Sequence, residues 1–309
     1  MANSTILSLV QTTLQAMGVA TYGNPATVIG NTNQDVVQTL ALVNVAGDEA
    51  AREFDWESAT KQHNFTATFY TYTGNTTADS TSVTSMSSIT SLDATFMAVG
   101  GSIPQDTFIS GTPAGTTVVL NRAPTKTATA VSITFSKVLF AVASDFDRLV
   151  DSTNWDKTKH WEMLGPRTPQ EREWLRSGYI STGPRIRWWK MGGYFSIWPP
   201  LGATEELSYE YQSKYWVLVT AAATPAPTKQ SFTVDTDTCI FPDAMMRALI
   251  RYKYFEAKGF NATSLAIKYQ EQLDLAKAHD AGGRTLSMAA RASDLLIGWG
   301  QIPDSGYGS

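Results

Sequence analysis

The sequence has little of what metal sites, disulfide frameworks and membrane spans require. Its 309 residues include one cysteine, Cys239, and three histidines that lie far apart. A single cysteine excludes an intramolecular disulfide framework and a cysteine-rich zinc site. No apolar run approaches the roughly 20 residues of a membrane helix, and Ile6–Ala20 lacks the basic flank of a signal peptide. We therefore expect a soluble chain that is made in the cytoplasm and uses no cofactor or metal.

A surplus of basic residues is also missing. The chain has 24 Lys and Arg against 28 Asp and Glu, a net charge of −4, which argues against a protein that wraps DNA. Hydrophobic content of 43% and charged content of 17% are ordinary for a folded protein. The length suffices for one large domain or two to three smaller ones. Aromatic content of 11% suits a protein that buries surface against partners.

Tryptophan is concentrated in the centre of the chain, because Ser144–Trp216 contains seven of the nine. In this stretch Ser144 is suited to cap a helix over Asp145–Val150, and the sequence from Thr168 to Glu171 predicts a capping-box start of another helix. Gly192 and Gly193 predict a tight hairpin. The alternation in Glu205–Val219 predicts a strand with two different faces.

Apolar residues at helical spacing predict helices near both ends of the chain. One covers Ser4–Met17 and a second begins with a capping-box-like start at Thr32, with Gly47 on its apolar stripe allowing a neighbour to approach closely. Two more are predicted from Phe241 to Lys258 and from Ala262 to His279. They form an αα-hairpin whose natural packing partners are the N-terminal helices.

Residues 64–137 differ from both ends in being rich in Thr, Ser, Val and Gly, with few charges. Their short alternating runs predict a small β-domain. The run Gly111–Gly115 has turn chemistry. It is no phosphate-binding loop, because no Lys-Ser/Thr pair follows it.

We therefore predict an α+β fold, an antiparallel bundle of N-terminal and C-terminal helix pairs with a small β-sheet and hairpin and an inserted all-β module. The expected domains are a discontinuous helical core of residues 1–69 and 138–283, the module of residues 70–137 and an extended docking tail of residues 284–309. The strand at residues 64–70 should neighbour Lys137–Ala143 in space. The apolar tail has no obvious core of its own, so we expect it to dock onto another molecule.

Catalytic and nucleic-acid hypotheses find weak support. Asp145, Asp147 and Asp151 crowd one predicted helix and are candidates for a metal site or an acid pair. Arg148 and Lys157 lie near them in sequence, which favours ion-paired surface instead.

The segment from Arg185 to Lys190 interleaves basic and aromatic residues, as nucleic-acid binding surfaces do. Strand alternation would divide these side chains between two faces of a hairpin, which favours one packed face. Neither set is a convergent active site, and we expect no enzymatic activity.

Four phrases in fixed order give the chain a family resemblance. They are Arg52-Glu53-Phe54-Asp55-Trp56, SDFDRLVDSTNWD from Ser144, GPRTPQEREWL from Gly165, and GPRIRWWKMGGYFSIWPP from Gly183, followed by LSYEYQSKYW. In this order they resemble the head-to-tail adaptor proteins of short-tailed, podovirus-like bacteriophages. The resemblance covers roughly residues 1–68 and 138–283. The inserted residues, about 70–137, depart from it.

The resemblance implies a structural protein of the phage neck and tail, made in the host cytoplasm. It implies a dodecameric ring beneath the portal protein that extends the DNA channel, offers a platform to the tail nozzle or tube protein, and lets genomic DNA pass without sequence-specific binding. It implies no contact with a membrane. The alternative hypotheses are a virion-associated tail enzyme, such as a cell-wall hydrolase, and a receptor- or carbohydrate-binding tail component.

The resemblance also assigns surfaces. It places portal docking on the tail, with the candidates Leu295, Ile297, Trp299, Ile302 and Tyr307. It places ring or tail packing on the hairpin, with the candidates Trp188, Trp189, Tyr194 and Trp198.

Overall fold

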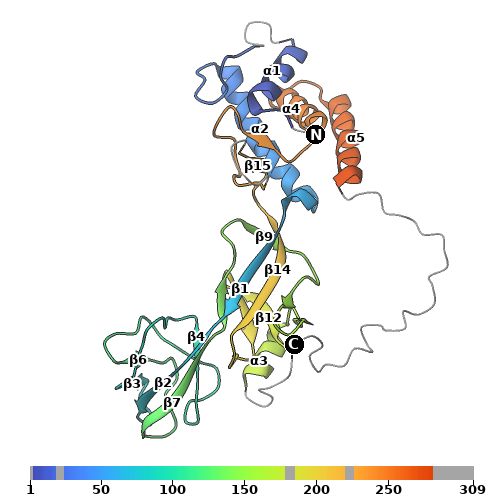
Figure 1. The fold of residues 1–309 in the computed structure, drawn as a ribbon. Helices are drawn as coiled ribbons and strands as arrows, with labels where there is room; N and C mark the ends of the chain where they lie inside the picture. The colour runs from blue at the N-terminus through green and yellow to red at the C-terminus, as the bar shows by residue number, and fades with distance from the viewer. Residues whose placement is uncertain (1–2, 19–23, 178–184, 220–225, 281–309) are drawn as a thin grey trace, which may run out of the picture. The chain divides into compact units, whose positions relative to one another are not determined.

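The computed structural model describes residues 3–18, 24–177, 185–219 and 226–280. These ranges contain five α-helices, one short 3-10 helix and sixteen strands (Figure 1). The helices are α1 (Ile6–Ala16), α2 (Gln34–Glu53), α3 (Pro169–Arg176), α4 (Asp243–Ala257) and α5 (Thr263–Asp280), and the 3-10 turn is Glu57–Ala59.

The strands pair in five sheets. The five-stranded sheet consists of β1 (Thr60–Ala67), β9 (Phe146–Leu149), β10 (Trp155–Asp156), β11 (Trp161–Glu162) and β14 (Glu205–Ser213). The four-stranded sheet consists of β2 (Phe69–Thr76), β7 (Ala128–Lys137), β4 (Phe96–Val99) and β5 (Thr107–Phe108). A three-stranded sheet contains β12 (Arg187–Met191), β13 (Tyr194–Trp198) and β8 (Leu139–Ala141). The two-stranded sheets pair β3 (Ser82–Val83) with β6 (Val118–Val119) and β15 (Val217–Leu218) with β16 (Thr238–Cys239).

The predicted fold class is wrong, because the described chain is mostly β with a few helices and is no helical bundle carrying a small sheet. Seven of the strands have only two residues each. Such strands are defined by backbone pairing with distant segments, and two residues cannot display a period of two. Sequence patterning therefore underestimates the β content.

The clearest local error concerns Asp145–Val150, which was predicted as a helix and forms β9 over Phe146–Leu149. β9 pairs with β14, with Leu149 opposite Tyr211 and Phe146 opposite Ser213. Ser144 therefore caps no helix. The pairing partner lies more than sixty positions away in the sequence, so no local signal announces it.

Two compact units make up the described residues. The first, which we call the helical unit, contains the described residues of Met1–Lys61, Asp145–Leu149 and Tyr211–Arg291. The second, which we call the β unit, contains Gln62–Ser144 and the described residues of Val150–Glu210. The hairpin of β12 and β13 thus falls in the same unit as the predicted module of residues 70–137.

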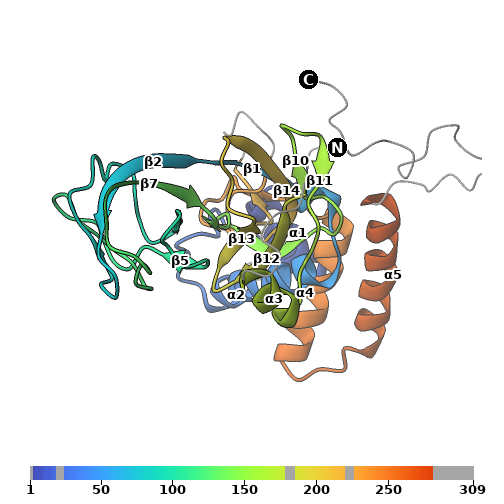
Figure 2. The ribbon, with the colours of Figure 1, turned by 90° about the horizontal axis from the view of Figure 1, so that it is seen from below.

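The helical unit contains four of the five α-helices, and the predicted packing of the N-terminal helices against a C-terminal αα-hairpin is confirmed. α4 and α5 lie side by side as an antiparallel pair (Figures 1 and 2), and α4 also contacts α1 and α2. Thr5 caps α1 by accepting a hydrogen bond from the Ser8 N–H, and Asn33 rather than Thr32 caps α2. Both caps satisfy N–H groups that the first turn of a helix leaves unpaired.

The core of the helical unit is built around Trp216, which is fully buried. Its indole stacks on Phe241 and meets Phe232 edge-on, with centroids 5.8 and 5.1 Å away. Its N–H donates to Asp48 over 2.8 Å. Gly47 supplies the space, because a Cβ at that position would lie 2.2 Å from the ring. The predicted close approach at Gly47 is therefore confirmed, and Trp216 is the neighbour.

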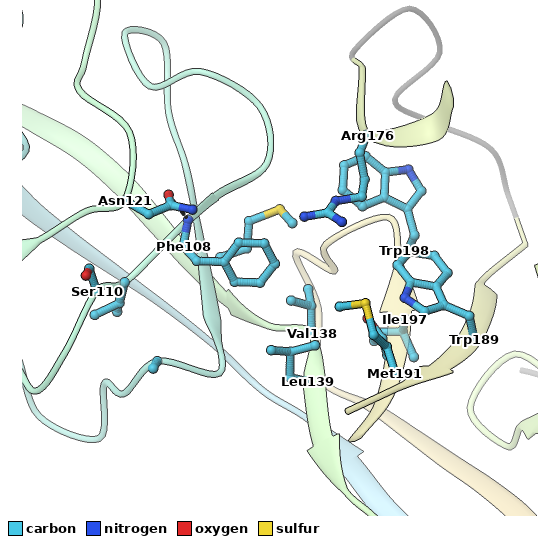
Figure 3. A pocket seen from close by; sticks show the side chains of 14 residues that line it. Phe108, Ser110, Asn121, Val138, Leu139, Arg176, Trp189, Met191, Ile197 and Trp198 are labelled. Atoms are coloured by element: carbon cyan, nitrogen blue, oxygen red, sulfur yellow. Dashed lines mark hydrogen bonds between the residues drawn. The ribbon is translucent and has the colours of Figure 1, made fainter. Parts of the chain in front are cut away.

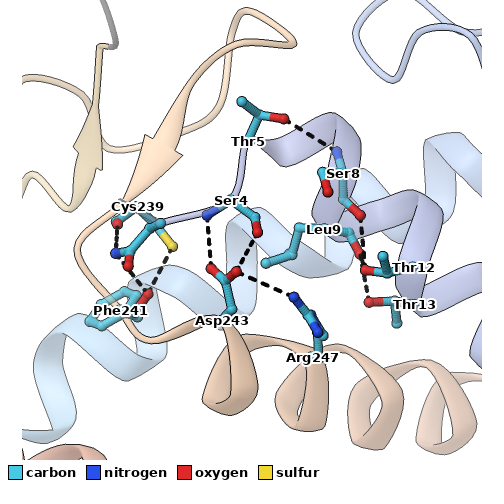
Figure 4. A network of polar contacts seen from close by, with 11 residues as sticks. Ser4, Thr5, Ser8, Leu9, Thr12, Thr13, Cys239, Phe241, Asp243 and Arg247 are labelled. Carbon is cyan, nitrogen blue, oxygen red and sulfur yellow. Dashed lines mark hydrogen bonds and ion pairs between the residues drawn. The ribbon is translucent and has the colours of Figure 1, made fainter. Parts of the chain in front are cut away.

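The N-terminal segment is attached to the start of α4 by side chains (Figure 4). The Ser4 N–H and hydroxyl both donate to the carboxylate of Asp243, and Arg247 donates to the same group. The Asn3 amide donates to the carbonyl of Phe241. These bonds hold the residues just before α1 against residues more than 230 positions later.

In the β unit, residues 69–137 form a core of their own, and β2 and β7 run together as a long antiparallel ribbon (Figure 2). The two ends of this segment meet, because the Lys137 N–H donates to the Thr68 carbonyl over 2.9 Å. The predicted neighbourhood of the strand at residues 64–70 and the segment beginning at Lys137 is present at this bond.

Candidate functional site

Asp145 lies at the centre of a buried hydrogen-bond network in the helical unit. Its carboxylate accepts bonds from the Lys61 ammonium, the Tyr211 hydroxyl and the Ser213 hydroxyl, at 2.7, 2.8 and 2.7 Å. Burial by itself would raise the pKa of this carboxyl, but these hydrogen bonds outweigh burial and hold the pKa of Asp145 below its ordinary value. A carboxylate saturated in this way is a weak base, and its contacts are structural.

The other two acidic candidates do not complete an acid pair. Asp147 forms an ion pair with Arg148, its neighbour in sequence, at 3.1 Å. Asp151 is exposed in the turn after β9. Asp145 forms an ion pair with Lys61. None of the three aspartates is therefore paired with another carboxylate as an acid pair would require.

Arg148 joins two of the phrases that carry the family resemblance. Its Nε donates to Asp55 over 2.6 Å, and an Nη donates to the Phe54 carbonyl over 3.1 Å. Asp55 belongs to the phrase at Arg52–Trp56 and Arg148 to the phrase that begins at Ser144. These phrases therefore meet in one place although 93 positions separate the two partners.

A buried carboxyl pair that the sequence did not reveal lies in the β unit, where Asp156 of β10 and Glu205 at the start of β14 come together. Glu205 and Asp156 are each 2% exposed, and Lys159 forms an ion pair with Glu205. Burial raises the pKa of Glu205. The hydrogen bond from Lys159 lowers this pKa, whereas the nearby charge of Asp156 raises it. The pKa of Glu205 therefore lies above its ordinary value. Asp156 accepts hydrogen bonds from the backbone N–H groups of Thr158 and Lys159.

Two helices of the helical unit present apolar side chains to solvent. On α2, Val37 and Val45 are 47% and 56% exposed, and Ala41, also exposed, lies between them on the same face at spacings of four. We call this set the α2 stripe. On α5, Ile267 and Leu275 are 59% and 53% exposed, while only Leu273 and Ala276 of this 18-residue helix are buried.

The hairpin is the predicted one, with Gly192 and Gly193 at positive φ in the two-residue turn between β12 and β13. Of the residues assigned to ring or tail packing, Trp188, Trp189 and Trp198 are buried within the β unit, and Tyr194 is exposed beside Met191. Trp188 and Trp189 are 3% and 4% exposed, so neither offers a free ring face on which a nucleic-acid base could stack, which removes the basis of the nucleic-acid hypothesis.

The two faces of the hairpin have different surroundings, an aromatic core on one face and cavities on the other. Trp188 stacks on Phe195 at 5.1 Å, and Phe195 stacks on Tyr209 at 4.9 Å, which builds an aromatic core on one face. Trp189 and Trp198 lie on the other face, where they line cavities. These cavities could not be predicted from sequence patterns, because their opposite wall comes from residues 94–121.

A cavity of about 310 Å³ lies between the hairpin and β4 and β5 (Figure 3). Its walls are mostly apolar and include Met97, Phe108, Val138, Trp189 and Trp198. A neighbouring cavity of about 360 Å³ shares Met97 and Trp198 with it and is lined further by Pro104, Pro199 and Pro200. We call the two together the Trp198 groove.

The five portal-docking candidates, Leu295, Ile297, Trp299, Ile302 and Tyr307, lie outside the described residues.

In the described part of the chain no three His, Cys, Asp or Glu side chains gather as a metal site would require. None of the described helices has the length and apolar character needed to cross a bilayer. Burial raises the pKa of the Cys239 thiol to about 12, so this thiol is unreactive.

Comparison with known proteins adds no family assignment. No protein-family model matches the sequence, and no curated protein matches it significantly.

Proposed function

We propose that this protein is a structural virion component, a head-to-tail adaptor of a short-tailed phage, and that it has no enzymatic activity. The observation that carries the proposal is the uncovered apolar surface on α2 and α5 of the helical unit. This unit has a complete core around Trp216, so it has no internal use for a valine stripe on α2 or for exposed Ile267 and Leu275. Contiguous exposed apolar side chains are typical of contact surfaces between subunits.

The order of the sequence phrases supports the adaptor class in particular. Asp55 and Arg148 come from different phrases and form an ion pair, and Asp145 binds Lys61, Tyr211 and Ser213. These contacts join three of the phrases, namely those that contain Asp55, Asp145 with Arg148, and Tyr211 with Ser213. They support treating these three phrases as one structural signature.

As an adaptor, the protein would form a dodecameric ring of its own copies beneath the portal protein in the neck of the virion. The tail protein would bind the ring on its other side, and the segment from Arg284 to Ser309 would dock onto the portal. The net charge of −4 suits a channel through which DNA slides without binding, because phosphate binding needs basic side chains.

The test is assembly with the portal. Purified protein alone and mixed with the portal protein of the same phage is measured by mass photometry, and the complex is imaged by electron microscopy. We expect a ring with twelvefold symmetry on the portal. If the mixture at micromolar concentration shows only the masses of the two separate proteins and no complex, the proposal is refuted. A ring that still binds the portal after removal of Arg284–Ser309 would refute the docking role of the tail.

A further inference from the structure

We propose that the Trp198 groove is a binding site for a proline-rich segment of another protein, held in the extended polyproline II conformation. The groove lies in the β unit, and its binding of a peptide does not depend on ring formation by the helical unit. Four features of the groove support it, namely its walls, its charge, its unpaired polar groups and its rim.

The walls have the composition of a peptide groove. The two cavities, of about 310 and 360 Å³, share the side chains of Met97 and Trp198, so Trp198 separates two adjacent subsites. Phe108 faces Trp189 and Trp198 across the first subsite (Figure 3). Pro104, Pro199 and Pro200 line the second. Aromatic-lined grooves of this kind bind polyproline II segments, whose conformation is largely set before binding.

The groove carries no net charge along its described lining. Arg176 lines the first subsite and Asp106 the second, and these two form an ion pair with 2.7 Å between Nε and Oδ1. Glu173 approaches the same guanidinium at 3.4 Å. The arginine is therefore neutralised and offers no site for a free anion. An uncharged ligand complements this electrostatic balance.

The unpaired polar groups select a ligand that accepts hydrogen bonds. Trp189 and Trp198 are 4% and 2% exposed, and neither indole N–H has a hydrogen-bond partner. Buried indole N–H groups normally find an acceptor. In Figure 3 the nitrogen-bearing edge of Trp189 turns toward Ile197 at the cavity, and the six-membered ring of Trp198 lies beside Arg176.

A proline segment meets this requirement, because each proline offers a carbonyl acceptor and has no N–H. A sugar brings hydroxyl donors together with its acceptors, so it matches the unpaired groups less well. The rim adds an adaptable contact, since Met191 lines the first subsite and is exposed beside Tyr194 at the hairpin tip. Methionine side chains adapt to varied ligand shapes.

The experiment uses the full-length protein and acetylated, amidated hexaproline, with binding followed by tryptophan fluorescence and calorimetry. A glycine–serine peptide of equal length and neutral maltohexaose are measured in parallel. We expect saturable binding of hexaproline alone, with one site per chain. Absence of hexaproline binding at millimolar concentration overturns the proposal, as does equal binding of the glycine–serine peptide. Binding of maltohexaose in place of hexaproline would assign the groove to glycans and overturn the peptide assignment.

Two pairs of variants locate the site. Ala94→Trp places a ring in the first subsite and should weaken hexaproline binding by about tenfold or more, equivalent to 1.4 kcal/mol. The exposed Ala203, which lies outside the groove lining, gives the control Ala203→Trp with no change.

Trp189→Phe removes one N–H donor and should weaken binding by about fivefold, while Trp174→Phe on the exposed face of α3 should not. Circular dichroism checks each variant for folding, and Ala94→Trp decides the outcome if Trp189→Phe fails to fold. Full affinity in Ala94→Trp would contradict the proposed site. Because binding to a single chain is measured, failure here leaves the ring proposal untouched, and failure to form rings leaves the groove untouched.

Discussion

The ammonium group of Lys61 lies 2.7 Å from a carboxylate oxygen of Asp145, and the same ammonium donates to the Pro227 carbonyl over 2.7 Å. The Lys61 side chain is 23% exposed and that of Asp145 is 10% exposed. Three distant segments therefore meet at one ion pair that is mostly removed from water.

Replacing this carboxylate should destabilise the protein. Asp145→Asn keeps the size of the side chain but leaves Lys61 without its counter-charge, and we expect a loss of about 2 kcal/mol in the free energy of unfolding. Urea denaturation measures the loss. Asp147→Asn is the matched control, because Asp147 makes a more exposed ion pair worth about 0.5 kcal/mol or less. Equal effects of both substitutions would contradict the structural role of Asp145.

Acid should destabilise the protein partly through the same group. The folded-state pKa of Asp145 lies below its ordinary value, so its contribution to stability is present above that value and is lost as pH falls through the folded-state pKa. We expect the melting temperature to fall below about pH 5. Asp145→Asn, which has no carboxylate to protonate, should show a shallower decline. Parallel melting curves for the two proteins from neutral to acidic pH would argue against this assignment.

Glu205 should have the opposite sign of pH dependence. Its folded-state pKa is raised, so its contribution to stability is complete below the ordinary value and is lost as pH rises through the folded-state pKa. Glu205→Gln imitates the protonated form and should stabilise the protein at neutral and alkaline pH by about 1 kcal/mol. The advantage should shrink toward acid. Melting curves at several pH values measure it, and the exposed neighbour gives the control Glu206→Gln, which should show no such trend.

Adding one methyl group at Gly47 should destabilise the helical unit. An alanine is favoured over glycine within a helix by about 1 kcal/mol, but here its Cβ would lie 2.2 Å from Trp216. Overpacking against a ring with no room to move should outweigh the gain and cost about 2 kcal/mol net. Thermal unfolding checks this. Gly202→Ala, at a site with nothing within 4 Å, should be neutral. A more stable Gly47→Ala variant would show that Trp216 can shift.

A charge on the α2 stripe should weaken assembly. Val45→Glu would bury a carboxylate in the proposed subunit contact, and we expect the dissociation constant of the assembled ring to rise by about tenfold or more. Mass photometry over a dilution series measures the change, with circular dichroism as the check on folding. Val119→Glu makes the same change at an exposed valine of the β unit and should leave assembly unchanged. If the Val45→Glu variant assembles as well as the unaltered protein, the α2 stripe is not part of the subunit contact.

Local signals predicted the elements whose causes are local. The capping box at Thr168 and Glu171, with Pro169 at the first position, forms as expected and begins α3. The Gly192-Gly193 turn forms because glycine tolerates positive φ at both positions. The helices at both ends follow from apolar spacing, and their bounds differ from the predicted ones by one to two residues.

Nonlocal pairing decided the rest. The sequence by itself determined four helices near the termini, the hairpin, a β-rich insert and a chain without disulfides or a cysteine-rich metal site. It could not show that Phe146–Leu149 is a strand, because β14 supplies the hydrogen bonds that make it one. Nor could it show that Asp145 and Lys61 pair, that Glu205 and Asp156 are buried together, or that Trp189 and Trp198 line a groove. Each of these depends on residues far apart in sequence that only the tertiary structure brings within contact distance, where burial and low local polarity change what a side chain can do.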